Sequence, residues 1–487
     1  MAAASVACAA RAQEPAGLAL DDAVRATLVS SPDVSLAEQE LQAARGRLLV
    51  SRSPFDLRLT STAAGSRTHA AGDGLEKTLS YGIGAERLLR SGVVISPEVV
   101  LARSGLSTRP GVETANAATP SVSVALPLLQ DRNGGVSRAA ERAASHRLES
   151  SRLSLRHTVS QSVYSVAVAY WGYLAAQRRL RVFVESEERA RVTVDQTRVL
   201  VQAEERTASD LNQTLGNLAS KQVAQIASEQ AVVEARAALG LAIGLPGERI
   251  ATLPPAVTDF PEPAAAGGPG GTEALLAGAY DRRADLGAAV QEQLAAERLR
   301  DGAQNALRPR LDLVVTSGYR GLGVGLGAGP FFTPLYRPDP QLDLEVALRF
   351  QFPFGNSRAR GDLLQSGAAA AQQQIVVRDL ERRIASGVWV AAGALERGAA
   401  SVLAAEEAVR LSELTVQAEQ RKFQLGASTL FDVIFAQDNL TSALLTEIES
   451  RRGYAVAIAS ARLQNGSLVA GNDLRAVDWR ALLTAPW

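Results

Sequence analysis

One stretch of the chain alternates apolar and polar residues with unusual regularity. From Leu342 to Phe352 every even position carries Leu, Val or Phe, and the odd positions carry Asp, Glu, Ala, Arg and Gln. A period of two predicts a β-strand with one apolar face and one face in water. Pro353 then removes a backbone donor, and from about Ser357 the hydrophobic period becomes helical. The stretch therefore predicts a strand that runs directly into a helix.

Five further runs alternate in the same way, although less regularly. They are Phe55 to Ala63, Lys77 to Leu89, Val93 to Arg103, Ser121 to Leu126 and Leu311 to Tyr319. With the first stretch they predict six strands.

The two runs on either side of Ser91-Gly92 form a candidate hairpin, because this pair suits a tight turn. Both runs are long enough to span a membrane, which takes about 9 to 11 residues per strand. The charged residues Glu86, Arg87 and Glu98 lie within them and leave an alternative open, in which the hairpin lies in a loop outside the sheet or folds against it. We expect the hairpin to join the sheet.

Two proline-free stretches carry helical periodicity. Their apolar seams are spaced by three and four residues and consist of Leu155, Val159, Val163, Val166, Tyr170 and Leu174, and of Leu380, Ile384, Val388, Ala391 and Leu395. This spacing predicts very long helices with a seam close to the coiled-coil period. In the first stretch a break between Ala203 and Ser209 leads to a returning helix that ends at 240–244.

The same series of elements occurs twice, which indicates an internal duplication. Each half reads as helix, β-hairpin, very long helix and returning helix. The predicted organisation is a signal-peptide remnant at 1–13, a first repeat at 14–244, a Pro/Gly linker at 245–272, a second repeat at 273–470 and a C-terminal tail at 471–487. One half offers too few strands to close a barrel, and its helical seams have no partner inside a compact core, so the pattern predicts self-association around an axis.

Composition excludes several classes of protein. Arginine plus lysine equals aspartate plus glutamate, 51 against 51, which disfavours a general nucleic-acid-binding surface. No uninterrupted apolar run of about 18 residues predicts a transmembrane helix, so a membrane span would have to be a β-barrel. Ala10-Arg11-Ala12 resembles a signal-peptidase site, which predicts export, and lipidation of Cys8 is left open by a weak lipobox resemblance.

No arrangement of residues indicates catalysis or a cofactor. Glycine at every second position from Gly321 to Gly329 does not match a dinucleotide fingerprint and indicates a loop or strand end. The single cysteine and three scattered histidines provide no zinc spacing, and no Ser/His/Asp arrangement occurs. We therefore expect no catalytic residue, no bound metal and no cofactor, and we expect that the protein is not an enzyme.

The chain resembles the TolC-like outer-membrane efflux protein family over essentially its whole mature length. The resemblance rests on the two halves, on the junctions Leu126-Pro127-Leu128-Leu129 and Phe352-Pro353-Phe354-Gly355, and on Lys422 to Val433, which looks like the family's helix-turn-helix tip. It implies an α+β membrane protein, a homotrimer whose outer-membrane β-barrel continues as a periplasmic α-helical barrel. It also implies a periplasmic adaptor and an inner-membrane transporter as partners, with no nucleic acid.

The resemblance also suggests site residues. Phe423, Gly426 and Thr429 would lie at the tip and contact the adaptor, with Gly426 supplying a positive φ. Asp432 matches one of the family's tip aspartates, which ring the axis of a trimer, and Phe435 replaces the second, so these two are the candidate gate. In the first half, Ala203 to Arg206 replaces the glycine turn.

Two hypotheses of different class remain. The first is an outer-membrane duct that exports substrates passively, driven by an inner-membrane pump. The second is a soluble periplasmic coiled-coil or adaptor-like structural protein, for which helices alone would suffice. The strand from Leu342 to Phe352 favours the first, because its apolar face is suited to lipid. The family norm is four strands per protomer, whereas six here would give a trimeric barrel of eighteen.

Overall fold

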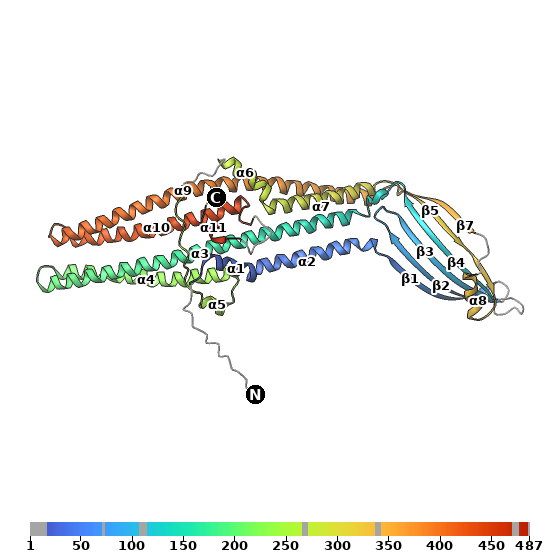
Figure 1. The fold of residues 1–487 in the computed structure, drawn as a ribbon, viewed down its shortest axis with the longest axis horizontal. Helices are drawn as coiled ribbons and strands as arrows, with labels where there is room; N and C mark the ends of the chain where they lie inside the picture. The colour runs from blue at the N-terminus through green and yellow to red at the C-terminus, as the bar shows by residue number, and fades with distance from the viewer. Residues whose placement is uncertain are drawn as a thin grey trace, which may run out of the picture. The chain divides into compact units, whose positions relative to one another are not determined.

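Long helices form most of the chain (Figure 1). The computed structural model describes residues 17–70, 74–106, 114–264, 271–336, 342–469 and 477–485. The predicted signal-peptide remnant, including Cys8, lies outside these residues. The chain divides into two compact units, one bounded by Met1–Gln39, Leu153–Gly287 and Asp379–Trp487, the other by Glu40–Arg152 and Ala288–Arg378.

The helices begin and end close to the predicted breaks. Their bounds are α1 Leu20–Ser30, α2 Pro32–Arg52, α3 Ala139–Gln202, α4 Ala208–Ile243, α5 Gly247–Ala251, α6 Gly271–Arg282, α7 Ala284–Ala306, α8 Ala328–Phe332, α9 Ser357–Gln424, α10 Leu430–Gln464 and α11 Trp479–Thr484. The two predicted seams are confirmed, since Val163, Val166 and Tyr170 are fully buried and Ile384 and Leu395 are almost so. By length and composition alone α9 could span a membrane, because one 18-residue window in it reaches a mean hydropathy of 1.2.

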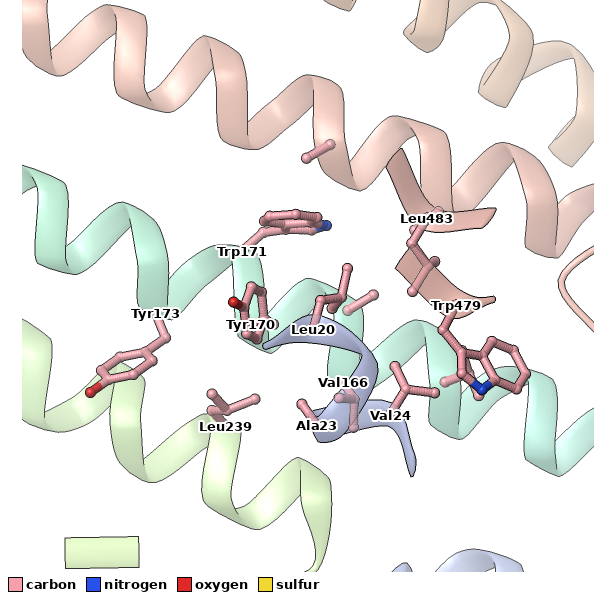
Figure 2. Close-up of a cluster of buried hydrophobic side chains, with 14 of the residues drawn as sticks. Leu20, Ala23, Val24, Val166, Tyr170, Trp171, Tyr173, Leu239, Trp479 and Leu483 are labelled. Carbon is pink, nitrogen blue, oxygen red and sulfur yellow. The ribbon is translucent and has the colours of Figure 1, made fainter. Parts of the chain in front are cut away.

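The first unit has a core built from segments far apart in sequence (Figure 2). Tyr170 and Trp171 of α3 pack edge to face, with ring centroids 5.3 Å apart. Leu20 of α1 and Trp479 of α11 are fully buried in the same cluster. Burying a large apolar side chain contributes about 1.5–3 kcal/mol, so this cluster is a main source of the unit's stability.

The described parts of the linker and the tail pack on the core of the first unit. The hydroxyl of Tyr170 donates to the carbonyl of Leu18 and accepts from the amide of Thr258, both at 2.9 Å. Phe260 is buried at 4 % exposure, so the described part of the linker, up to residue 264, packs on the core. Residues 477–485 of the predicted tail contain α11, whose Trp479 is buried.

The second unit contains one antiparallel sheet. Its strands are β1 Arg58–Ala70, β2 Gly74–Leu88, β3 Val94–Leu106, β4 Ala115–Pro127, β5 Arg310–Tyr319, β6 Gly321–Val324 and β7 Leu342–Gln351. Their order is β1-β2-β3-β4-β5-β7, and β6 also pairs with β4. Because β5 and β6 pair with β4 in the same register, they form one interrupted strand, and the sheet has the six strand positions that the sequence predicts.

Several predicted strand boundaries were wrong, most of all those of the first and fourth strands. The first strand begins at Arg58 rather than Phe55, because Pro54 stabilises a 3₁₀ turn in which Phe55 is buried at 5 % exposure. It also runs on to Ala70 rather than ending at Ala63. The fourth strand was predicted as Ser121 to Leu126 but spans Ala115–Pro127. Its first half is rich in alanine and therefore lacks the alternation that marks a strand.

The extra hairpin joins the sheet, as predicted. Strand β2 pairs with β1 along its length, and β3 pairs with β4. Glu86 lies opposite Arg58 and Glu98 lies opposite Gly84, so both carboxylates project from one face. The Arg58 and Glu86 side chains approach to 3.7 Å there. The two carboxylates therefore do not exclude the hairpin from the sheet, because they share a polar face, whereas Arg87 lies on the opposite face close to the end of β2.

The register sorts the side chains into two distinct faces. We call one of them the apolar face. Its aligned pairs include Leu59 with Ala85, Ile83 with Val99, Val124 with Val315, Leu313 with Leu348 and Leu311 with Phe350. The other, which we call the polar face, carries Arg58, Glu86, Glu98, Asp343, Glu345 and Arg349. Ile83 and Leu348 are each 67 % exposed, so the apolar face is open in the single chain.

The alternating glycines make room for a short covering segment. A Cβ at Gly321 would lie 2.0 Å from the carbonyl oxygen of Pro334, and one at Gly323 would lie 3.3 Å from that of Pro330. Helix α8 therefore folds back over the apolar face, where Phe331 packs edge to face on Tyr81 at 5.8 Å between centroids. The interpretation as strand-end and loop glycines is confirmed.

Candidate functional site

The turn between α9 and α10 holds the three predicted docking residues. Helix α9 ends at Gln424, and the amide of Gly426 donates to the carbonyl of Phe423 at 3.0 Å. The amide of Ala427 reaches back to the carbonyl of Lys422 at 2.8 Å. Gly426 has φ of +71°, the left-handed conformation predicted for it. This is a glycine-terminated helix end of the Schellman type.

Helix α10 begins with a capping box. The hydroxyl of Thr429 accepts from the amide of Asp432 at 3.3 Å, and the Asp432 carboxylate accepts from the amide of Thr429 at 2.9 Å. The two side chains satisfy otherwise unpaired backbone donors at the helix start. Ser428 donates to Glu419 of α9 at 2.7 Å and so ties the turn to the preceding helix. The turn is therefore fixed on both sides.

The turn between α3 and α4 has the same backbone pattern without a glycine. The amide of Glu204 donates to the carbonyl of Val201 at 3.1 Å, and that of Glu205 donates to Leu200 at 2.9 Å. Glu204 takes the position of Gly426 and has φ of +62°. Thr207 and Asp210 form the matching capping box. The replacement of the glycine turn by Ala203 to Arg206 therefore changes the side chains and leaves the backbone geometry of the turn unchanged.

The two turns contact one another. The guanidinium of Arg206 lies over the ring of Phe423, 5.1 Å from its centroid. Phe423 is half-buried, whereas Gly426 and Thr429 are exposed. Sequence reasoning missed Arg206, because no periodicity links a residue in one turn to a residue in the other. The docking candidates thus belong to a composite surface made by both turns.

The candidate gate residues lie on the exposed side of α10. Asp432 lies in its first turn, and Phe435 stacks on Phe431 with ring centroids 6.3 Å apart. The pKa of Asp432 is lowered because the hydroxyl and the amide of Thr429 donate to its carboxylate. In the single chain, therefore, this carboxylate is an ionised helix cap beside two exposed aromatic rings, 60 % and 57 % accessible.

Polar contacts join the two hairpins behind the turns. Lys221 of α4 pairs with Asp438 of α10 at 2.5 Å. The hydroxyl of Thr441 on α10 lies 3.3 Å from that of Ser186 on α3. Arg189 donates to Thr441, and burial lowers the pKa of its guanidinium. A pocket of about 260 Å³ lies here, lined by residues that include Arg189, Phe423 and Val433.

These side chains provide no metal-binding arrangement. Among the residues that the structure describes, no three His, Cys, Asp or Glu side chains are grouped closely enough to hold a metal ion. The prediction that the protein binds no metal or cofactor remains a prediction. What the site offers is a pair of hydrogen-bonded turns with an exposed carboxylate and exposed aromatic rings.

Comparisons with known proteins place this geometry in a family. The sequence profile described as outer membrane efflux protein matches residues 23–245. The fold matches that of the CmeC outer membrane channel of Campylobacter jejuni with a TM-score of 0.66 and 15 % identity, over 93 % of this chain and 87 % of that one. Residues 23–245 of the chain thus match the outer membrane efflux protein family. The resemblance to this family that the sequence indicates is confirmed.

A further solved structure and a curated relative extend the comparison. The open state of the MtrE outer membrane channel of Neisseria gonorrhoeae matches with a TM-score of 0.66 and 17 % identity, over 93 % of this chain and 90 % of that one. A curated relative, the pyoverdine export outer membrane protein OpmQ of Pseudomonas putida, is 28 % identical over 314 residues. That alignment covers 64 % of this chain and 62 % of the relative.

Proposed function

We propose that the protein is the outer-membrane duct of a tripartite efflux or type I secretion system. It would export substrates passively from the periplasm, driven by an inner-membrane pump that acts through a periplasmic adaptor. The single observation that carries this proposal is the apolar face, which is exposed outside the part that α8 covers, on a six-position sheet in a chain that matches an efflux family. A soluble adaptor-like protein would not leave such a face exposed, because a large exposed apolar patch marks an interaction or membrane site, or leads to aggregation.

The edges of the sheet support a homotrimer. Strands β1 and β7 each pair on one side only within the described chain. Open sheet edges are not tolerated in the hydrocarbon of a membrane, because each unpaired backbone group there costs several kcal/mol. Pairing β7 of one copy with β1 of the next removes both edges. Three copies with six strand positions each would form a barrel of eighteen strands.

The two faces then have separate roles. The apolar face would contact lipid, and the polar face with Glu86 and Glu98 would line a wet lumen. The helices would extend into the periplasm as a second barrel. The two-repeat organisation, 14–244 and 273–470 around the linker at 245–272, is part of the proposal, and the matching capping boxes at Thr207 and Thr429 support it.

At the hairpin turns we assign docking and gating. Phe423, Gly426 and Thr429 would contact the adaptor, and three copies of Asp432 with Phe435 would surround the axis. Three close carboxylates repel one another, bind cations and raise one another's pKa. In the single chain the pKa of Asp432 is lowered by its cap, so assembly would oppose the capping interaction.

Membrane fractionation tests the main proposal. We expect the protein in the outer-membrane fraction as a heat-modifiable trimer, and recovery as a soluble monomer in the periplasm would refute it. A photo-crosslinker at Thr429 should capture the adaptor, and failure to capture it would remove the docking assignment alone.

Single-channel recording tests the gate. Asp432→Asn removes the charge but keeps an oxygen that can accept from Thr429, so the cap persists. It should weaken cation block and raise conductance. Asp210→Asn in the other turn is the matched control. If both variants conduct like the wild type, Asp432 is not part of the gate.

A further inference from the structure

The charged residues of the apolar face are all cations. Among its positions on the described strands, the charged side chains are Arg67, Lys77, Arg87 and Arg103, and aspartate and glutamate are absent. The polar face, in contrast, mixes both signs. Three of the four cations lie near one end of the sheet, and Arg87 lies near the other. We call the three cations at that one end, Arg67, Lys77 and Arg103, the basic cluster.

The register brings the three cations of the basic cluster together. Arg67 lies directly opposite Lys77, and Arg103 lies opposite Leu79 on the neighbouring strand pair. Directly opposed residues have Cβ atoms about 4.5–5.5 Å apart, and like charges at such positions destabilise the sheet. Within the described chain no carboxylate pairs with Arg67 or Lys77. The register therefore concentrates positive charge at this point of the apolar face.

Arg103 is held in place at the side of this pair. Its Nε donates to Asn116 at 2.7 Å, and its Nη2 donates to the carbonyl of Gly327. The guanidinium also lies 4.9 Å from the centroid of the Phe331 ring. These partners are neutral, so the full positive charge remains, fixed in orientation at low entropic cost.

A recess lies between the three cations. A pocket of about 620 Å³ is lined by Arg67, Lys77 and Arg103, together with Gly65, Gly105 and Leu326. Neither glycine places a side chain over the strands, which leaves the floor of the pocket open. Its dimensions and charge suit a compact, multiply charged anion with an apolar body, because the neighbouring positions on this face are apolar.

We propose that the basic cluster binds the phosphate groups of a phosphorylated glycolipid in the outer leaflet of the membrane. The proposal rests on the proposed function. Strands β4 and β7 lead into the long helices at the opposite end of the sheet, so in an outer-membrane barrel with periplasmic helices the cluster lies at the outer leaflet. Basic pockets at that depth recognise anionic headgroups, while the apolar rows below them contact the acyl chains.

Binding of labelled lipopolysaccharide to the purified full-length protein in detergent tests this inference. The variant is the double substitution Arg67→Gln and Lys77→Gln, which leaves the structural contacts of Arg103 intact. The matched control is Arg87→Gln, which removes a cation from the same face at the other end. We expect the double variant to bind about tenfold more weakly and the control to bind like the wild type. Phosphatase-treated lipopolysaccharide should bind the wild type as weakly as the intact lipid binds the double variant.

Three results would overturn the inference. The first is that the double variant binds lipopolysaccharide as tightly as the wild type does. The second is that the wild type binds phosphatidylglycerol micelles as tightly as lipopolysaccharide. The third is complete displacement of lipopolysaccharide by millimolar inorganic phosphate, which would indicate a site for free phosphate. Conductance in planar bilayers is recorded in parallel. A wild type that fails to insert as a trimer refutes the proposed function, whereas the comparison in detergent reports on the site alone.

Discussion

The two hairpin turns have the same backbone, built from different residues. Both have a left-handed residue after the first helix and a Thr–Asp capping box before the second. One uses Gly426, for which that conformation has little steric cost, and the other uses Glu204, for which it costs about 1–2 kcal/mol. The comparison shows that the caps and the packed helices determine the turn, and that glycine lowers its cost without being required.

The largest effect should come from a β-branched residue at the left-handed position. Gly426→Val should destabilise its turn by about 2 kcal/mol, because a branched Cβ at positive φ is strongly disfavoured. Glu204→Val should cost less than half as much, because a Cβ is already present there. Hydrogen exchange of the Ala427 and Glu205 amides, which close the two turns, measures both. Equal effects would show that the turns are not strained to different degrees.

Removal of the caps should affect the two turns alike. Thr429→Ala and Thr207→Ala each remove a side-chain acceptor at a helix start, which costs about 1 kcal/mol. Exchange of the Asp432 and Asp210 amides should accelerate by roughly fivefold in both variants. A large effect in only one turn would show that the capping boxes are energetically unequal despite their common geometry.

Sequence reasoning found most of the fold because its signals are local. Period-two runs, the helical seams and the proline positions depend on neighbouring residues, and they located the strands and helices. The composite nature of the site could not be predicted, because the contact between Arg206 and Phe423 joins turns far apart in the chain. The strained Glu204 also gives no sequence signal, since glutamate is an ordinary helix-forming residue.

Introducing glycine at the strained position should stabilise that turn. Glu204→Gly relieves the left-handed strain, although glycine adds conformational freedom to the unfolded chain. The net gain should be about 0.5–1 kcal/mol, seen as slower exchange of the Glu205 amide. Glu205→Gly, one residue further on, is the control and should give no such gain. A faster exchange in Glu204→Gly would mean that the glutamate side chain stabilises the turn.

The smallest effect concerns acidification of the cap on α10. The pKa of Asp432 lies below its ordinary value of 3.8 because Thr429 donates to the ionised form. The capping contribution is therefore complete above pH 3.8, and it is lost as the pH falls through the lower folded value. Exchange of the Thr429 amide, corrected for its intrinsic rate, should stay constant down to that ordinary pKa and rise below it. Asp432→Asn should abolish the pH dependence. In the assembled trimer a rise that begins above pH 3.8 would indicate that three copies of Asp432 repel one another across the axis, as the proposed gate requires.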